Sequence, residues 1–273
     1  LLRARVHQQD NTQDAAIFYY KKYLERQPQD QDAAYDFAFT LYKAQKYQDL
    51  EVITSRMNDK RALPLLARAL IERRDHEGAL AAFQHYIATL SDEERPLYDD
   101  ISLVGTKREI GAYRIHALSD NTEQRERFLD RFWLQKDKFK TSGGALRRAE
   151  HYRRVWHART LFGKKWPWDK RGEVYIRWGA PDYRSKSSEL NAKVPLDIQL
   201  IQETMAHQIY GNEGLDASFV GPVFPVKTQG MGSFSSSSSD GLGFSKYKPV
   251  TASSSSSSVP WEVWIYKNLG NGI

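Results

Sequence analysis

The sequence predicts an α+β protein: an α-helical array over residues 1–96, followed over 97–273 by helices and a small antiparallel sheet. Three observations favour this class. Apolar residues recur at helical spacing from the start to about residue 128. Strand-type alternation begins only near residue 173. The chain has 273 residues, enough for two domains, and 12% of them are aromatic, enough for packed cores.

The composition excludes several classes of site. The chain contains no cysteine, which excludes disulfides, zinc ribbons, iron–sulfur ligation and thiol catalysis. No run approaches the roughly 18 consecutive apolar residues of a membrane-spanning helix. The sequence opens on Leu1 without an initiator methionine or a signal peptide. We therefore interpret it as an internal fragment and expect any anchor or export signal to lie upstream.

The array is expected to consist of three helical pairs. The second helix of the first pair should end at Pro28, because proline cannot continue the hydrogen-bond ladder. Small residues, Ala38 and Ala67, stand where the helices of the next two pairs must approach closely. One pair cannot bury its own apolar face, so the pairs should stack and leave a concave side free to bind.

One helix of the first pair carries a recognisable set of residues, namely Ala16, Tyr20, Tyr23 and Pro28. They fall at the Ala, Phe, Ala and Pro positions of a tetratricopeptide repeat (TPR), which the segment 14–28 resembles. Aligning Ala16 with Leu50 and Ala79 gives spacings of about 34 and about 29 residues, against roughly 34 in the repeat. The second spacing predicts a trimmed connection near 58–62. The alternative interpretation is that these helices form an ordinary α-helical domain. The resemblance to the repeat implies that the array binds a protein partner and catalyses no reaction.

The second domain is expected to combine helices and strands. Helices are predicted over 107–116, 122–133 and 145–162. Residues 173–178 and 259–266 alternate and are rich in β-branched and aromatic residues, which predicts two strands. The chain stops after turn-type residues at 268–272, where a returning strand would begin, so we expect the domain to be truncated at its C-terminus.

Four motifs follow one another along this domain. They are Phe132-Trp133-x-x-Lys136-Asp137, Glu150-His-Tyr152-Arg-Arg154-Val155-x-x-Ala158, Trp168-Asp-Lys-Arg171-Gly172-x-Val174-Tyr175-Ile176-x-x-Gly179-x-Pro181-Asp182, and Pro260-x-Glu262-x-Trp264-x-Tyr266. In this order they resemble the motifs of GWxTD-domain proteins over about 97–273. The Gly-Trp-x-Thr-Asp run itself is absent, so the chain is identified as a divergent member. This bacterial family often carries export signals and tetratricopeptide repeats, and it has no established activity.

The two resemblances imply a non-enzymatic scaffold or accessory subunit that mediates protein–protein interaction in a bacterial multi-protein assembly. They imply a location in the cell envelope, periplasmic or exported, with the cytoplasm as the alternative. The alternative function is an enzyme or a glycan-binding domain that uses the Trp- and Asp-rich region 166–182. Membrane association is expected only through an upstream segment or a partner.

Positive charge is concentrated in one stretch of the chain. Residues 131–186 hold 16 Lys and Arg against 5 Asp and Glu, although the net charge of the whole chain is +6. A helix that binds nucleic acid would gather its cations on the exposed side. The helix 145–162 instead divides them between two sides, which disfavours nucleic acid as a partner. The residues expected opposite the apolar arc are Arg147, Glu150, His151 and Arg154.

Arg148 and Arg159 fall inside the apolar arc of the same helix. An unpaired charge in such a position costs several kcal/mol, so a partner is required. We therefore predict that Arg148 or Arg159 turns inward and forms an ion pair with Asp137 or Asp169.

No catalytic, cofactor-binding or metal-binding residue is predicted, and no cofactor is expected. The histidines form no HxH or HxxxH pair, and no P-loop, dinucleotide-binding glycine pattern, nucleophile elbow or HExxH motif occurs. Most Trp residues are expected in the core, and the two beside Pro167 at the surface. The candidate partner-binding residues are Tyr19, Tyr35, Tyr42, Trp166 and Trp168.

Two serine tracts, 235–239 and 253–258, lie within a segment, 233–258, that is expected to form flexible loops. Serine there is either true linker sequence or a substitute for residues whose identity was not established. No function is assigned to either tract.

Overall fold

The computed structural model describes residues 1–10, 12–117, 122–137 and 142–186, together with scattered residues beyond them. The latter are 195–198, 200, 201, 204, 223–225, 247–249, 262–267 and 269. This part of the chain is mostly helical with short antiparallel strand pairs, which confirms the α+β class. It divides into two compact units, Leu1–Gly179 and Ala180–Ile273.

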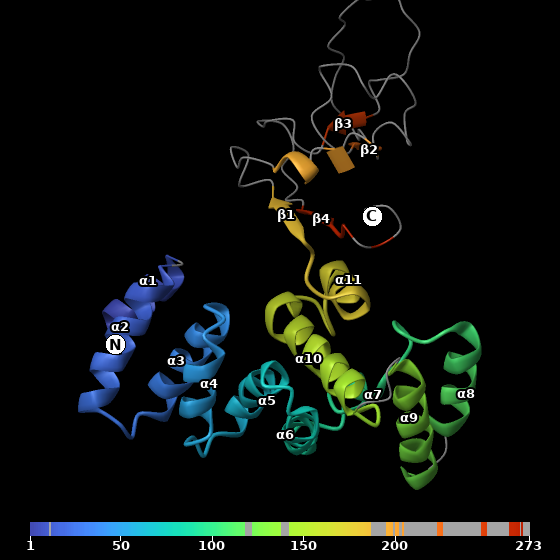
Figure 1. Cartoon of the computed structure of the whole chain (residues 1–273), viewed down its shortest axis with the longest axis horizontal. Coiled ribbons are helices and arrows are strands. Elements are labelled where there is room, and N and C mark those ends of the chain that lie inside the picture. Colours follow the sequence, from blue (N-terminus) through green and yellow to red (C-terminus); the bar gives the residue numbers. More distant parts are fainter. Residues whose placement is uncertain are drawn as a thin grey trace, which may run out of the picture. The chain divides into compact units, whose positions relative to one another are not determined.

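The first six α-helices of the described chain pack in sequence, each against the next (Figure 1). They are α1 (Leu2–Gln9), α2 (Gln13–Arg26), α3 (Gln31–Lys43), α4 (Tyr47–Thr54), α5 (Leu63–Glu72) and α6 (His76–Ala88), with a 3₁₀ turn, η1 (Lys60–Ala62), before α5. Asp30 and Asp75 cap α3 and α6 by accepting hydrogen bonds from backbone amides of the first turn. Ala38 and Ala67 are fully buried, as close helix approach requires.

Five further helices complete the first unit. They are α7 (Pro96–Asp99), α8 (Lys107–Ala117), α9 (Thr122–Lys136), α10 (Ala145–Phe162) and α11 (Lys170–Trp178). The long helix α10 packs against α5, α6, α7, α9 and α11. Its Tyr152 meets Phe83 of α6 and Tyr98 of α7 edge to face, with ring centroids 6.2 and 5.9 Å apart. These contacts are why the boundary predicted after residue 96 lies inside one compact unit.

The side of α3 that carries Phe39 and Tyr42 is covered by α10. The ring of Trp156 lies 5.4 Å from the ring of Tyr42 and 6.5 Å from that of Phe39, edge to face in both cases. Trp156 itself is buried. At this position the array contacts a helix of the same chain, α10.

The strand predicted over 173–178 is a helix, α11. Asp169 caps it by accepting a hydrogen bond from the backbone amide of Arg171, and Gly172, Tyr175 and Ile176 are buried at helical spacing. The strand prediction followed intrinsic β-propensity, which is weak against tertiary packing. Here packing against α10 decides the conformation.

The described residues of the second unit form two antiparallel strand pairs. Strand β1 (Tyr183–Lys186) pairs with β4 (Glu262–Ile265), and β2 (Val223–Pro225) pairs with β3 (Tyr247–Pro249). Strand β4 confirms the strand predicted over 259–266 for its described residues. Strand β3 lies within 233–258, so the prediction of loops throughout that segment is wrong there. Both serine tracts, and the turn predicted at 268–272 apart from residue 269, lie outside the described residues.

Candidate functional site

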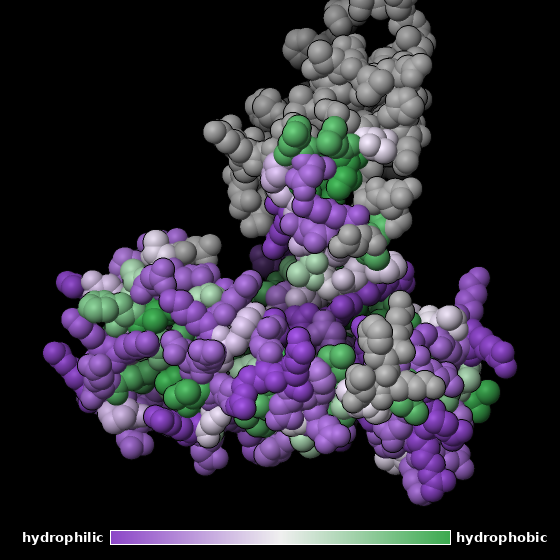
Figure 2. All heavy atoms as spheres, viewed as in Figure 1, coloured by the Kyte–Doolittle hydropathy of each residue, from purple (hydrophilic) through white to green (hydrophobic). Residues whose placement is uncertain are grey.

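A surface groove of about 550 Å³ lies between α2 and α4, with α3 beneath it; we call it the α2–α4 groove. Its apolar side chains come from all three helices, and Val52 at its edge is 51% exposed. In Figure 2, hydrophobic residues reach the surface over this part of the array among hydrophilic ones. The lining residues are Lys21, Leu24, Glu25, Pro28, Gln31, Ala34, Phe37, Asp49, Val52, Ile53, Arg56 and Met57.

The groove lies beside a short helix, α4. Helix α4 has 8 residues, whereas α2 has 14 and α6 has 13. After α4 the chain soon turns into η1, which Asp59 caps by accepting from the amide of Arg61, and Pro64 stands in the first turn of α5. The prediction of a trimmed connection near 58–62 is wrong: residues 55–62 join α4 to α5, whereas only 27–30 join α2 to α3. The reduced repeat spacing comes instead from the shorter helices α4 and α5.

Charged side chains border the groove on both walls. Lys21 of α2 and Asp49 of α4 form an ion pair across it, with Nζ and Oδ2 3.6 Å apart. Glu25 lies one turn further along α2, and Arg56 follows the end of α4. Within the described part of the chain, neither Glu25 nor Arg56 forms an ion pair. The groove thus has an apolar lining, one neutralised pair and two unpaired charges of opposite sign.

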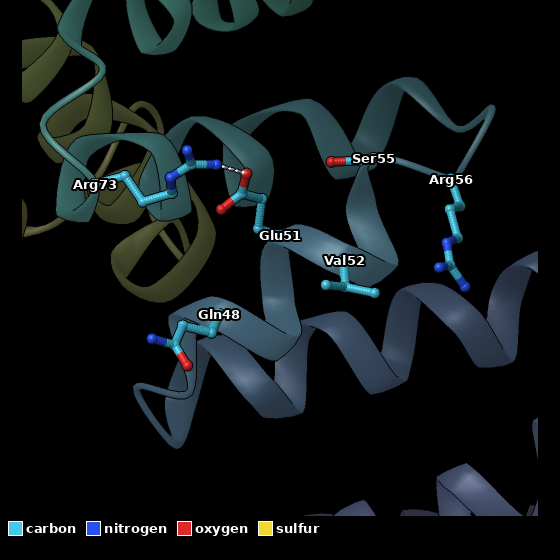
Figure 3. Close-up of a pocket in the computed structure, with 6 residues that line it drawn as sticks. All are labelled: Gln48, Glu51, Val52, Ser55, Arg56 and Arg73. Atoms are coloured by element: carbon cyan, nitrogen blue, oxygen red, sulfur yellow. Dashed lines mark hydrogen bonds and ion pairs between the residues drawn. The ribbon is translucent and has the colours of Figure 1, made fainter.

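A second hollow, of about 540 Å³, lies on the other side of α4 (Figure 3). The ion pair between Glu51 of α4 and Arg73, the residue after α5, lies at its edge. Val52 and Arg56 line both hollows, so the outer edge of α4 stands between them. Sequence reasoning did not single out Val52; the short repeat spacing was the only signal of an incomplete outer layer.

Tyr42, predicted to bind a partner, is buried and holds α3 to α10. Its hydroxyl lies 2.7 Å from Nδ1 of His157. Burial raises the pKa of Tyr42 well above its ordinary value. The ring of His157 stacks on that of Tyr175 in α11, with centroids 4.0 Å apart and planes 8° apart. Tyr42 is therefore part of the internal packing.

The other two tyrosine candidates are half-buried and lie outside the groove. Tyr35 lies beneath the guanidinium of Arg61, 4.9 Å from its ring centroid, and burial raises its pKa. Tyr19 stacks on His7, with centroids 5.4 Å apart. The structure therefore does not gather the three tyrosines into one surface.

The tryptophan candidates behave partly as predicted. Trp166 is 53% exposed, with the guanidinium of Arg159 4.5 Å from its ring centroid. Trp168 is half-buried next to Gly172, where an added Cβ would approach it to 2.6 Å. Trp133 and Trp156 are buried, as predicted. Trp178, expected in the core of a strand, is 52% exposed at the end of α11, and Trp264, also expected in the core, is half-buried in β4.

Arg148 turns inward, as predicted, but its partners differ from those predicted. It is 5% exposed, and its guanidinium contacts Glu126 at 2.8 Å and Asp130 at 3.0 Å, both on α9, and Asp99 at 3.6 Å. Its Nε donates to the hydroxyl of Tyr152, which in turn donates to Asp99. Burial opposes the charged form of Arg148, but these neighbours outweigh it and raise its pKa.

Arg159 also finds a carboxylate, that of Glu94 at 2.7 Å, and donates to the backbone oxygen of Pro167. The two carboxylates named by the sequence serve other purposes. Asp137 accepts hydrogen bonds from the amide and hydroxyl of Ser142 before α10, and Asp169 caps α11. The prediction of inward arginines is confirmed, and the prediction of Asp137 or Asp169 as their partners is wrong. Spacing on one helix could not reveal the acids of α7 and α9.

On the side of α10 opposite its apolar arc, His151 is buried, and Arg147, Glu150 and Arg154 are half-buried. Burial, with repulsion from Arg154, lowers the pKa of His151 to about 4 against a smaller opposing effect of the Tyr98 backbone. Its ring packs 4.9 Å from that of Trp133. Burial raises the pKa of Glu150, but Arg153 and Arg154 outweigh it and lower that pKa to about 2. Glu150, Arg153 and Arg154 thus form a local cluster of ion pairs on α10.

Within the described ranges, no group of three acidic or histidine side chains is arranged to hold a metal ion. No helix in that part of the chain combines the length and apolar character needed to cross a bilayer. No protein-family model, curated protein or solved structure matches this chain.

Proposed function

We propose that this protein is a non-enzymatic scaffold or accessory subunit that binds another polypeptide through the α2–α4 groove. The observation that carries the proposal is the apolar groove itself, with Val52 half-exposed at its edge. Grooves with an apolar lining and a polar rim are the usual docking sites for peptide segments. The candidate contact residues move accordingly from the buried Tyr42 to the walls of the groove.

A repeat origin of the array supports this function. Ala16, Leu50 and Ala79 are each the fourth residue of their helix, α2, α4 and α6, and each is fully buried. Equivalent positions in successive helical pairs are what a repeat array of the tetratricopeptide kind would have. We therefore propose that the array is TPR-like and that α4 is a shortened second helix of its middle repeat. Repeat arrays of this kind present extended surfaces to other proteins.

The second part of the proposal concerns family and location. Phe132 and Trp133 of the first GWxTD-like motif are buried with Ile101 and Leu129, and Tyr152 of the second lies in the α7–α9–α10 contact. Their burial supports a structural role for these motifs, which would brace the array. We propose on the sequence resemblance that the protein is a divergent GWxTD-domain protein of a bacterial envelope-associated or exported assembly.

Affinity purification of the tagged chain from its native source, with mass spectrometry of co-purifying chains, tests this function. We expect a specific partner that is lost from the Val52→Asp variant, because the groove then carries a buried charge. Ile115→Asp, at a residue of α8 that is 72% exposed, is the matched control and should retain the partner. Equal recovery with both variants, or turnover of a small molecule by the partner-free chain, would contradict the proposal.

A further inference from the structure

We propose that the segment bound in the α2–α4 groove is an amphipathic α-helix that carries a cation on the flank facing α2 and an anion on the flank facing the end of α4. This inference rests on the proposed function and adds the class of ligand and its charge pattern. Three properties of the groove lead to it: its backbone, its dimensions and its charges.

The backbone of the groove favours a helix over an extended peptide. Most of the lining belongs to α2, α3 and α4, whose amides and carbonyls are largely paired within each helix, and only Pro28, Arg56 and Met57 lie beyond helix ends. An extended peptide would find no sheet edge to pair with and would bring its own unpaired polar groups against an apolar surface. A helix arrives with its backbone hydrogen bonds already made and needs only apolar contact, the helix-in-groove mode of recognition.

The dimensions of the outer layer also fit an added helix. Helix α4 is six residues shorter than α2, which corresponds to about 9 Å of missing helix. Leu24 of α2 and Met57, beyond the end of α4, line the groove with Ile53 of the last turn of α4, and Ala34 on the floor allows close approach. One face of a helix of about two turns would cover these side chains and complete the layer that α4 leaves unfinished.

The unpaired charges on the two walls of the groove determine which flank of the bound helix carries a cation and which carries an anion. The Lys21–Asp49 ion pair spans the groove at one end, so these two charges are already neutralised. Glu25 on α2 and Arg56 after α4 line the remainder, and neither has an ion-pair partner among the described residues. Complementarity therefore requires Lys or Arg toward Glu25 and Asp or Glu toward Arg56.

Panning of two displayed peptide libraries on the full chain tests this inference. One library is patterned as 14-residue amphipathic helices; the other is identical except for a central proline, which breaks a helix. We expect binders only from the first library. For a synthesised binder, Val52→Asp should raise the Kd about tenfold or more, whereas Ile115→Asp should leave it within about twofold.

Charge exchange tests the orientation with a second pair of variants. In the double variant Glu25→Lys and Arg56→Glu, the same binder should lose about tenfold in affinity, and a peptide with its two flanking charges exchanged should recover it. Circular dichroism of each variant checks that the fold is kept. Equal binding of both peptides to the double variant would overturn the charge pattern.

The inference as a whole is overturned if proline-containing peptides compete for the groove, or if no helical peptide distinguishes Val52→Asp from Ile115→Asp. The proposed function fails separately. If the native partner requires Val52 but contacts it through a non-helical segment, the scaffold function stands and the helical ligand is wrong. If no native partner depends on Val52, the function itself is wrong.

Discussion

Helices α10 and α4 show opposite relations between composition and exposure. Helix α10 contains five arginines, yet ten of its 18 residues are buried. Helix α4 has few charges, yet only Leu50 and Thr54 of its 8 residues are buried, and Val52 is half-exposed. From hydropathy alone, α4 would be expected to be the more buried of the two helices.

The difference lies in the number of neighbours. Helix α10 packs against five helices, and three of them, α7, α9 and α11, supply carboxylates or hydroxyls for its cations, whereas α4 packs mainly on α3 and α5. Charges that find partners become part of a rigid interior. Apolar side chains that find none are left available to another molecule. The α10 region therefore gives the protein its rigidity, and the α4 region its proposed binding surface.

The largest expected effect comes from removing the central cation of the α10 region. Arg148→Met leaves Asp99 and Glu126 facing each other without their counter-ion, and we expect the free energy of unfolding to fall by about 3–5 kcal/mol. Urea denaturation measures the change. Arg127→Met, which removes an exposed pair with Glu123, should cost less than about 1 kcal/mol. Similar losses for both variants would mean that Arg148 is not a central contact.

Acid should weaken the α10 region through His151. Its pKa in the folded protein, about 4, lies below its ordinary value, so the unfolded chain binds a proton first as the pH falls. The stability due to neutral His151 is complete above about pH 6.5 and is lost toward pH 4, by about 3 kcal/mol. Denaturant unfolding across this range should show the loss in the wild type and a smaller one in His151→Phe. If the wild type and His151→Phe lose the same amount of stability between about pH 6.5 and about pH 4, His151 does not contribute to the acid sensitivity.

A smaller effect is expected where α3 meets α10. Tyr42→Phe removes one hydrogen bond, that between the hydroxyl and His157, and keeps the ring contact with Trp156. We expect a loss of about 1 kcal/mol in the free energy of unfolding. Tyr19→Phe is the matched control, for which a change within about 0.5 kcal/mol is expected. A negligible effect at Tyr42 would show that the ring contacts alone hold α3 to α10.

The smallest effect on stability is expected in the α4 region. Val52 is half-exposed, so Val52→Asp should change the free energy of unfolding by no more than about 0.5 kcal/mol while it abolishes partner binding. Thermal unfolding measures the first quantity and co-purification the second. A loss of several kcal/mol would mean that Val52 belongs to the core, which would erase the contrast with α10.

Much of the fold could be predicted where local signals and packing agree. Proline at position 28 and the helical spacing of Ala16 and Tyr20 fixed α2, and the continuous periodicity of 145–162 fixed α10. The error at α11 arose because β-branched and aromatic residues also occur in a helix whose buried face is decided by a distant neighbour. The boundary after residue 96 was unpredictable for the same reason, since contacts of α10 with α5 and α6 link residues far apart in sequence.

The candidate site was harder to predict than the fold. Inward rotation of Arg148 followed from helix geometry, but its acids lie on other helices and could not be paired by spacing. Aromatic residues such as Tyr42 are common at interfaces, yet the same properties make them good internal contacts. The groove lies beside a shortened helix, α4, and the only trace of the missing turns in the sequence is the reduced spacing between repeats.

The brevity of α4 also has a consequence for the timing of recognition. Two turns of helix are held by few consecutive hydrogen bonds, so the amides around Val52 should open to solvent at a free energy well below that of global unfolding. Hydrogen–deuterium exchange there would be faster than in α3 and would slow when the groove is filled. Binding would then have to order this segment, and the loss of its conformational entropy would reduce the affinity. A lower affinity favours short-lived complexes over permanent ones.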